Sequence, residues 1–264
     1  MTQPISPQLL LFSEGCLLWA CAAYAVSSDP LPGEQRSFQK MSWRIGFFAR
    51  AVFACGFAYG LSRSWLFAIA LFGITIAQPL VRYYLSPARS AEIECTFVAV
   101  LLGFLLATIK TLHLVPIEVA QLPLTPEHKG ALCILIASLL FSVRGGTYIV
   151  RGVLKKAGAL PTIRKQTDVI IVDETEYNRG RLIGNLERVI LAIVAAAGSY
   201  AALGFLIAAK GLVRFEGGDH SRDFTEYFLI GSLTSVLIAL CTGLLIRFFL
   251  LAFWPELLSL QMQP

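Results

Sequence analysis

The stretch YFLIGSLTSVLIALCTGLLIRFFLLAF, residues 227–253, decides the fold class of this chain. Its only charged residue is Arg247, and it is longer than one bilayer crossing needs, since a spanning helix takes about 20 mainly apolar residues. Lipid offers no partner for free backbone N–H and C=O groups, so such a segment must form a helix. The stretch therefore predicts a membrane-spanning helix.

Six more apolar blocks precede this one. They cover residues 8–26, 45–61, 65–84, 93–114, 131–150 and 186–209. Only 15% of the residues are charged and the mean hydropathy is +0.68, whereas roughly a quarter of a soluble domain is charged. A large soluble helical domain is thereby excluded. We predict an all-α integral membrane protein with about seven transmembrane helices.

The one hydrophilic insert divides the chain into three parts. We predict an N-terminal membrane domain of about five helices (1–150), a cytoplasmic insert (151–181) and a C-terminal two-helix membrane module (182–264). The insert opens with the basic stretch RGVLKKAGALPTIRK and continues as TDVIIVDETEYN. Residues 168–172 are expected either to pair as a strand or to lie on the surface. The basic half is expected to contact anionic lipid headgroups.

Loop charges predict the orientation. With seven spans, one side collects Arg36, Lys40, Arg44, Arg82, Arg89, Arg151, Lys155, Lys156, Arg164, Lys165, Arg179 and Arg181. The other side collects Arg63, Lys110, Lys129, Lys210, Arg214 and Arg222. Positive residues favour the cytoplasm. This two-to-one bias predicts an N-terminus outside and a C-terminus inside.

The first apolar block also has the length of a signal peptide. Residues 1–7 contain no Lys or Arg, so the basic n-region of a signal peptide is missing, although Ala20, Ala22 and Ala23 resemble a cleavage site. We expect this block to be a retained first helix.

Metal, cofactor and nucleic-acid sites find no support in the sequence. The six cysteines all fall inside apolar blocks, without CxxC spacing, and the three histidines do not cluster with carboxylates. The net charge of +5 is better explained by a basic cytoplasmic face than by nucleic acid. We predict no metal, no cofactor and no catalytic residue.

Polar residues inside the apolar blocks are costly and therefore informative. Four of them are candidates for a polar cavity: Glu14, Arg50, Gln78 and Glu94. The simpler alternative, which we favour, is that Glu14 pairs with Arg50 inside the bundle while Arg82, Glu92 and Glu94 stay at the interface. Pro79 is in a position to kink the third block.

The C-terminal third carries small residues and charges in a regular pattern. Gly180 and Gly184 share a helical face and permit close helix approach. The pattern predicts two tightly packed antiparallel helices joined by a charged corner. The residues of that corner are Glu187, Arg188, Lys210, Arg214 and Glu226, among which Lys210, Arg214 and Glu226 are expected to pair.

Three motifs in this region carry a family resemblance: RGRLIGNLERVI (179–190), GFLIAAKGLVRF (204–215) and TEYFLIGSLTSVLIAL (225–240). In this order they resemble the C-terminal module of the domain-of-unknown-function 3307 family of bacterial membrane proteins, with Ser232 in place of a Thr. The resemblance covers about the last 75 residues. It implies a helical fold and a bacterial inner membrane, and no established activity.

The N-terminal part departs from that family. Its members begin with a His-x-x-Gly-Asp-Phe motif resembling a metal-hydrolase site. Here Gly15 matches, but Phe12 and Cys16 replace the His and the Asp. Gln78 and Glu94 fall at plausible places for family acids, and Val98 at that of a His. The resemblance thus implies a scaffold that has lost its metal ligands.

Three functions remain open after this reading. The one we favour is a non-enzymatic scaffold or subunit of a membrane complex, which packs against itself or against other membrane subunits. The second is a small-solute or ion transporter or channel, with Glu14, Arg50 and Arg144 along a polar path. The third is a membrane-embedded hydrolase acting on a lipid-linked substrate, for which Glu14 and Glu94 are the one credible carboxylate pair.

Overall fold

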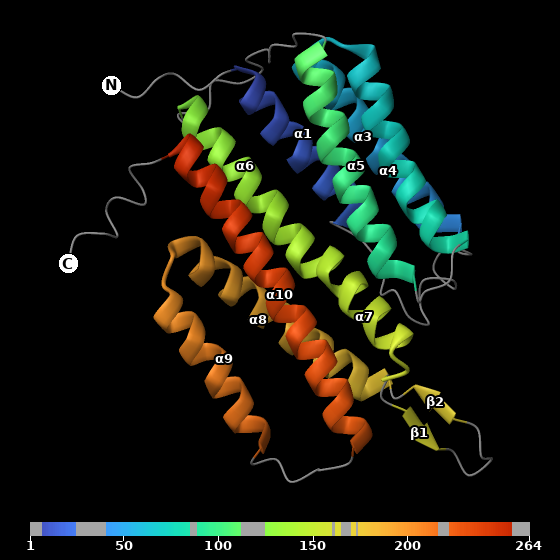
Figure 1. The fold of residues 1–264 in the computed structure, drawn as a ribbon. Coiled ribbons are helices and arrows are strands. Elements are labelled where there is room, and N and C mark those ends of the chain that lie inside the picture. Colours follow the sequence, from blue (N-terminus) through green and yellow to red (C-terminus); the bar gives the residue numbers. More distant parts are fainter. Residues whose placement is uncertain are drawn as a thin grey trace.

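The computed structural model describes residues 7–24, 41–84, 89–111, 125–159, 162–164, 170–172, 174–215 and 222–254. Within these ranges the chain is helical apart from two short strands (Figure 1). The helices are α1 (Pro7–Tyr24), α3 (Met41–Ser62), α4 (Trp65–Tyr84), α5 (Ser90–Thr111), α6 (Pro126–Leu140), α7 (Gly146–Lys156), α8 (Glu174–Ala197), α9 (Tyr200–Phe215) and α10 (Arg222–Phe253). Strands β1 (Thr162–Arg164) and β2 (Ile170–Val172) pair antiparallel, with Ile163 opposite Ile171.

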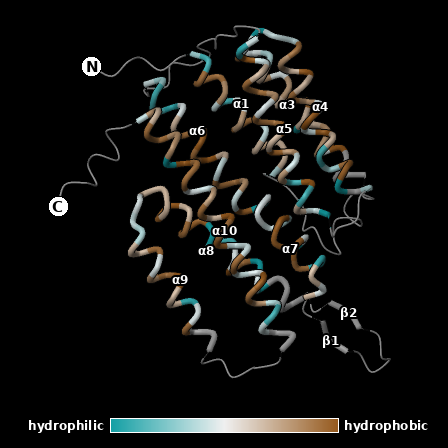
Figure 2. The backbone as a smooth tube through the Cα atoms, in the orientation of Figure 1, coloured by the Kyte–Doolittle hydropathy of each residue, from teal (hydrophilic) through white to brown (hydrophobic). Residues whose placement is uncertain are grey.

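Five of the described helices are long and apolar enough to cross a membrane. They are α3, α4, α5, the continuous helix formed by α6 and α7, and α10. Apolar residues predominate along them in Figure 2. The predicted helical membrane class is supported at this level, whereas seven spans are not found. The helix α4 continues through Pro79.

Helix α1 forms the centre of the N-terminal bundle. It packs against α3, α4, α5 and α6, and it buries Leu11, Trp19 and Tyr24 completely or nearly so. A side chain at Gly15 would contact Leu105 of α5 and Phe67 of α4 at 3.2 Å, so glycine allows these three helices to approach closely. The block expected to be a retained first helix is therefore part of the core.

The predicted sixth span, 186–209, is two helices instead of one. The chain breaks at Gly198, whose φ of +75° suits glycine, and α9 then runs back along α8. Glu187 of α8 and Lys210 of α9 form an ion pair, so both helices are at the same level there. The eleven residues from Glu187 to Gly198 rise only ~16 Å, about half of a hydrocarbon core.

Arg247 of α10 completes the break between α8 and α9. Its Nη1 donates a hydrogen bond to the carbonyl oxygen of Ala196 at 3.2 Å, and its guanidinium occupies the space that a side chain at Gly198 would need. Backbone groups at a helix end inside a membrane need such partners. The arginine that interrupts the last apolar block thus caps the end of α8.

Helices α8 and α10 run parallel, and this corrects the predicted antiparallel pair. Gly180 faces Tyr227, Arg188 bonds to Ser235, and Arg247 bonds to Ala196, so the contacts advance together along both helices. They are in close contact at Gly243, where a Cβ would lie 2.6 Å from the Ala192 oxygen and the Ala195 Cβ. Helix α9, lying between them in sequence, reverses the chain once more.

The beginning of α1 and the end of α10 lie at the same end of the bundle, which we call the terminal end (Figure 1). Phe12 stacks on Phe249 with ring centroids 5.8 Å apart. The rings of His128, at the start of α6, and Trp254 have centroids 4.0 Å apart. The opposite end, which we call the β end, carries β1 and β2. The predicted orientation, with the N-terminus outside and the C-terminus inside, stays a prediction.

The predicted insert is also shorter than expected. Residues 151–156 belong to α7 and residues 174–181 to α8, so only the segment between these helices is outside them. The expected strand at 168–172 is confirmed as β2 over residues 170–172. The predicted two-helix module contains three helices, and α10 packs on α6 and α7 as well as on α8. It is therefore continuous with the N-terminal bundle.

Candidate functional site

Gln78 and Glu94, two of the four predicted intramembrane residues, come together with Tyr24 and Arg82. We call these four residues the sealed cluster. The Tyr24 hydroxyl donates to Glu94 Oε2 at 2.7 Å, and Gln78 Nε2 donates to the same oxygen and to the Tyr24 hydroxyl, both at 3.0 Å. Arg82 forms an ion pair with the other Glu94 oxygen. Helices α1, α4 and α5 are joined by this network.

The sealed cluster is buried and balanced in charge. Glu94 is fully buried within the protein and Arg82 nearly so, and the expectation that both lie at the membrane interface stays a prediction. The Arg82 guanidinium also lies 3.8 Å from the ring centroid of Tyr148 on α7. Glu92, by contrast, is exposed and pairs with Lys156 at 2.8 Å. The cluster accordingly has the features of a structural lock between helices.

The other two candidates lie elsewhere. Glu14 pairs with Lys129 of α6 at 2.7 Å, and Arg50 Nε donates to the Gly46 carbonyl of its own helix at 3.1 Å. The predicted Glu14–Arg50 pair is therefore wrong. Glu14 and Tyr24 are separated by ~15 Å along α1, so Glu14 does not reach the sealed cluster. The carboxylate pair that a hydrolase would need does not form.

A π-helical segment, Phe141–Gly145, joins α6 to α7. Such a segment disturbs the regular hydrogen-bond ladder and often occurs at functional sites. Two carbonyl oxygens of this segment accept hydrogen bonds from Arg188: Ser142 O from Nε at 2.8 Å and Val143 O from Nη2 at 3.3 Å. Gly146 provides the space, because a side chain there would lie 3.0 Å from Arg188 Nε.

Arg188 also bonds to three polar side chains. It donates to Thr147 Oγ1 at 2.9 Å, to Ser235 Oγ at 3.2 Å and to Asn185 Oδ1. Every one of these partners, like the two carbonyls, is neutral. Arg188 is only 3% exposed. It therefore holds a full positive charge inside the protein, fixed in position and without a carboxylate among its hydrogen-bond partners.

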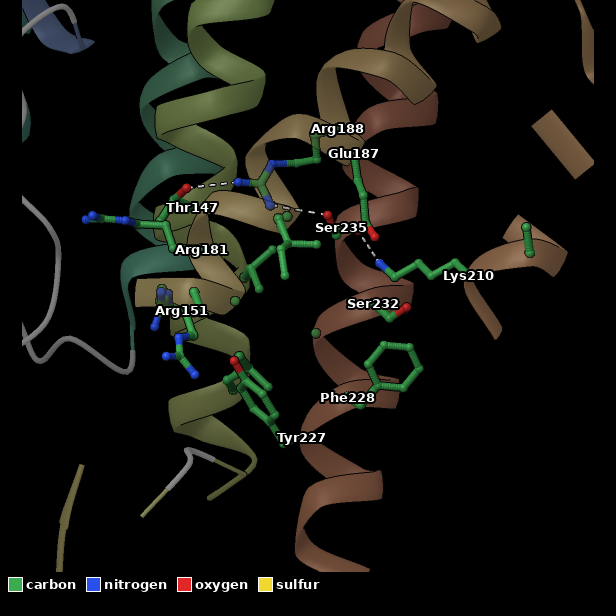
Figure 3. A pocket seen from close by; sticks show the side chains of 18 residues that line it. Thr147, Arg151, Arg181, Glu187, Arg188, Lys210, Tyr227, Phe228, Ser232 and Ser235 are labelled. Atoms are coloured by element: carbon green, nitrogen blue, oxygen red, sulfur yellow. Dashed lines mark hydrogen bonds and ion pairs between the residues drawn. The ribbon is translucent and has the colours of Figure 1, made fainter. Parts of the chain in front are cut away.

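A cavity of about 670 Å³ opens beside Arg188 at the β end (Figure 3). Four helices line it: α7, α8, α9 and α10. The cavity is lined by Thr147, Val150, Arg151, Leu154, Arg179, Gly180, Arg181, Ile183, Gly184, Glu187, Arg188, Ala209, Lys210, Tyr227, Phe228, Gly231, Ser232 and Ser235. We call it the basic pocket.

The lining of the basic pocket is strongly positive. Its cationic residues are Arg151, Arg179, Arg181, Arg188 and Lys210, and its one carboxylate, Glu187, is already paired with Lys210. Figure 3 shows Arg151 and Arg181 on one side and Lys210 on the other. A cavity that is surrounded by charges of mainly one sign attracts ligands of the opposite sign.

The structure brings together three of the five residues of the predicted charged corner. Glu187, Arg188 and Lys210 do lie together, but Lys210 pairs with Glu187 and not within the expected trio. Glu226 is exposed near the start of α10, and the Arg214 side chain is outside the part that the structure describes. Sequence reasoning missed Thr147 and Arg151. The one sequence signal near them was the Gly145-Gly146 pair, which is unusual inside an apolar block.

All three motifs that carry the family resemblance reach the basic pocket. The first provides Arg188, the second Lys210 and the third Tyr227. No family model, no curated protein and no solved structure matches this chain. The resemblance therefore stays a prediction, and the function has to be argued from the pocket itself.

Proposed function

We propose that this chain is a multi-pass membrane protein that binds an anionic ligand in the basic pocket, without catalysing a reaction on it. One observation supports this most strongly: the buried charge of Arg188 contacts neutral partners only and lies beside an open cavity. A buried charge is costly unless an opposite charge offsets it. An anion bound in the cavity provides that charge.

The basic pocket differs in this respect from a structural ion-pair network. In the sealed cluster Arg82 has Glu94 as its partner, so no further ion is needed. In the pocket, Glu187 is the only carboxylate among the lining residues and serves Lys210. The five cations of the lining support a binding role, which is compatible with the non-enzymatic scaffold or subunit that we favoured from the sequence.

We further propose that the β end faces the cytoplasm and that both termini are outside. The support comes from counting Lys and Arg at the two ends of the bundle. This count leaves out the arginines inside the apolar blocks, namely Arg50, Arg144, Arg188 and Arg247. Among the other described residues twelve Lys and Arg lie at the β end: Arg44, Arg82, Arg89, Arg151, Lys155, Lys156, Arg164, Arg179, Arg181, Lys210, Arg214 and Arg222. Three lie at the terminal end: Arg63, Lys110 and Lys129. This bias exceeds the one predicted for seven spans.

The membrane itself is inferred from the resemblance, which implies a bacterial inner membrane. A reporter that is active only outside the cytoplasm, fused after residue 264, is expected to be active. The same reporter inserted after Gly158, beyond α7, is expected to be silent. Activity at Gly158 with silence at the C-terminus would reverse the orientation, and the same result at both positions would contradict the placement of these two points on opposite sides.

The transporter alternative finds less support. Glu14 contacts α6, Arg50 contacts its own helix, and Arg144 lies in the π-helical segment. These three residues do not line the basic pocket. A hydrolase also has little support, because the described residues contain no group of three or more His, Cys, Asp or Glu placed to hold a metal.

Anion binding can be tested on the purified protein in detergent. Inorganic phosphate is expected to raise the melting temperature by several degrees relative to sodium chloride at equal ionic strength, because a ligand that binds only the folded state stabilises it. Arg181→Gln is expected to reduce this shift. Arg63→Gln, at the terminal end, is the matched control and is expected to keep it. Equal melting temperatures in phosphate and chloride would overturn the proposal.

A further inference from the structure

The walls of the basic pocket identify the chemical class of the ligand more closely. Resting on the proposed anion binding, we infer that the ligand is an amphiphile: a phosphate group carried on a hydrocarbon chain, with the phosphate in the pocket and the chain on the apolar surface beside it. Three observations carry this inference, namely the size of the cavity, the division of its walls and the exposed apolar surface at its rim.

The cavity is larger than a bare anion needs. Its volume of about 670 Å³ lies within the range of roughly 300–1,000 Å³ that is usual for sites that bind organic ligands. Such sites are mostly apolar with a few polar groups that fix the orientation of the ligand. The basic pocket follows this pattern, because Val150, Leu154, Ile183, Ala209 and Phe228 line it together with the cations.

The polar part of the wall suits a phosphate. The guanidinium group presents its N–H donors as a planar fork that matches phosphate oxygens, and several arginines together favour a group with more than one negative charge. Arg151, Arg179 and Arg181 line the pocket, and Tyr227 lies near Arg151 in Figure 3. The N–H groups of Arg188 are already bonded to protein oxygens, so Arg188 contributes its positive charge.

The apolar part of the wall continues to the outside of the molecule. Ile183 lines the pocket and is 53% exposed. Its neighbours Leu182 and Leu186 on α8 are exposed as well, as is Leu229 on α10. Exposed leucines and isoleucines on a membrane helix face hydrocarbon. A chain attached to a phosphate in the pocket can therefore leave over Ile183 into the lipid, whereas a free phosphate would not use this surface.

The level of the pocket fits a headgroup as well. The Glu187–Lys210 pair lies ~16 Å along α8 from the break at Gly198. The first turns of α8, which lie between this ion pair and the β end, are rich in charged residues. The pocket thus lies where apolar helix surface gives way to charge, as a lipid phosphate does.

The test compares three probes on the purified protein in detergent: dihexanoylphosphatidic acid, glycerol 3-phosphate and dihexanoylphosphatidylcholine. Affinities are measured by native mass spectrometry or calorimetry. Phosphatidic acid is expected to bind about tenfold or more tightly than glycerol 3-phosphate, because its chains bury additional apolar surface. The zwitterionic lipid is expected to bind more weakly than phosphatidic acid, because its headgroup carries no net charge.

Two variants separate the parts of the site. Ile183→Asn is expected to weaken phosphatidic acid binding and to leave glycerol 3-phosphate binding unchanged, whereas Arg181→Gln is expected to weaken both. Ile190→Asn is the matched control, since Ile190 is an equally exposed residue of α8 that does not line the pocket. It is expected to bind phosphatidic acid like the parent protein.

The possible failures are distinguishable from one another. Equal affinity for phosphatidic acid and glycerol 3-phosphate would overturn the amphiphile inference and leave anion binding in place. Equal affinity for the two lipids would show that the net negative charge of the headgroup is not recognised, which also overturns the inference. Binding of none of the phosphate probes would overturn the proposed function together with the inference.

Discussion

Two buried arginines, Arg82 in the N-terminal bundle and Arg188 in the C-terminal helices, solve the same physical problem differently. Arg82 pairs with Glu94 and stacks on Tyr148 within the sealed cluster. Arg188 bonds to carbonyls and hydroxyls only, next to an open cavity. Helix α7 lies between them, with Tyr148 toward one arginine and Thr147 toward the other.

The comparison shows how charge balance separates structure from function. A buried ion pair needs no further counter-ion, and it joins the helices that provide it. A buried cation with neutral partners keeps its electrostatic cost until an anion arrives. The sealed cluster is therefore expected to control stability, whereas the basic pocket controls ligand binding. The following variants test this division, from the largest expected effect to the smallest.

The largest effect is expected from Glu94→Leu, which leaves Arg82 buried without its carboxylate. The free energy of unfolding in detergent is expected to fall by about 3–5 kcal/mol. The double variant Arg82→Met with Glu94→Leu is expected to recover most of this loss, since no charge is left buried. Equal stability of the single and double variants, measured by reversible unfolding, would contradict the ion-pair explanation.

Gly243→Leu tests the parallel packing of α8 on α10. The new side chain meets the Ala192 oxygen and Ala195, so the helices must separate, at a cost of about 1–3 kcal/mol. Gly103→Leu on α5 is the control, because the space around Gly103 is open to 4 Å and no loss is expected. If Gly243→Leu were as stable as Gly103→Leu in thermal melting, the close contact would be wrong.

Gly198→Ala tests the break between α8 and α9. An alanine with positive φ costs about 1–2 kcal/mol, and here its Cβ also displaces the Arg247 guanidinium. Gly204→Ala within α9 has open space around it and is expected to be neutral or slightly stabilising. A stabilised Gly198→Ala protein would indicate a continuous helix, as the apolar block alone predicts.

The smallest effect is expected from Glu92→Gln. This residue pairs with Lys156 in an exposed position, where solvent screens the interaction. The melting temperature is expected to stay unchanged within error, in contrast to Glu94→Leu two positions away. A loss as large as that of Glu94→Leu would show that burial is not what distinguishes the two carboxylates.

The sequence predicted the apolar helices well, because the length and composition of a membrane helix follow from the thickness of hydrocarbon. It also placed Gln78 and Glu94 as polar residues that need an explanation, and they do meet. Their partners Tyr24 and Arg82 were not foreseen, because α1, α4 and α5 are brought together by packing over long sequence separations. The Glu14–Arg50 pair failed for the same reason.

The sequence alone thus determined that most of this chain is apolar helix with its positive charges unevenly distributed, since hydropathy and charge are local properties. Only the tertiary structure decided that the sixth block turns back at Gly198, and hence that the start of α1 and the end of α10 share one end of the bundle. It also decided that Arg188 is buried beside a cavity. Both depend on contacts with Arg247, Ser142 and Ser235, which lie about fifty residues away in the chain.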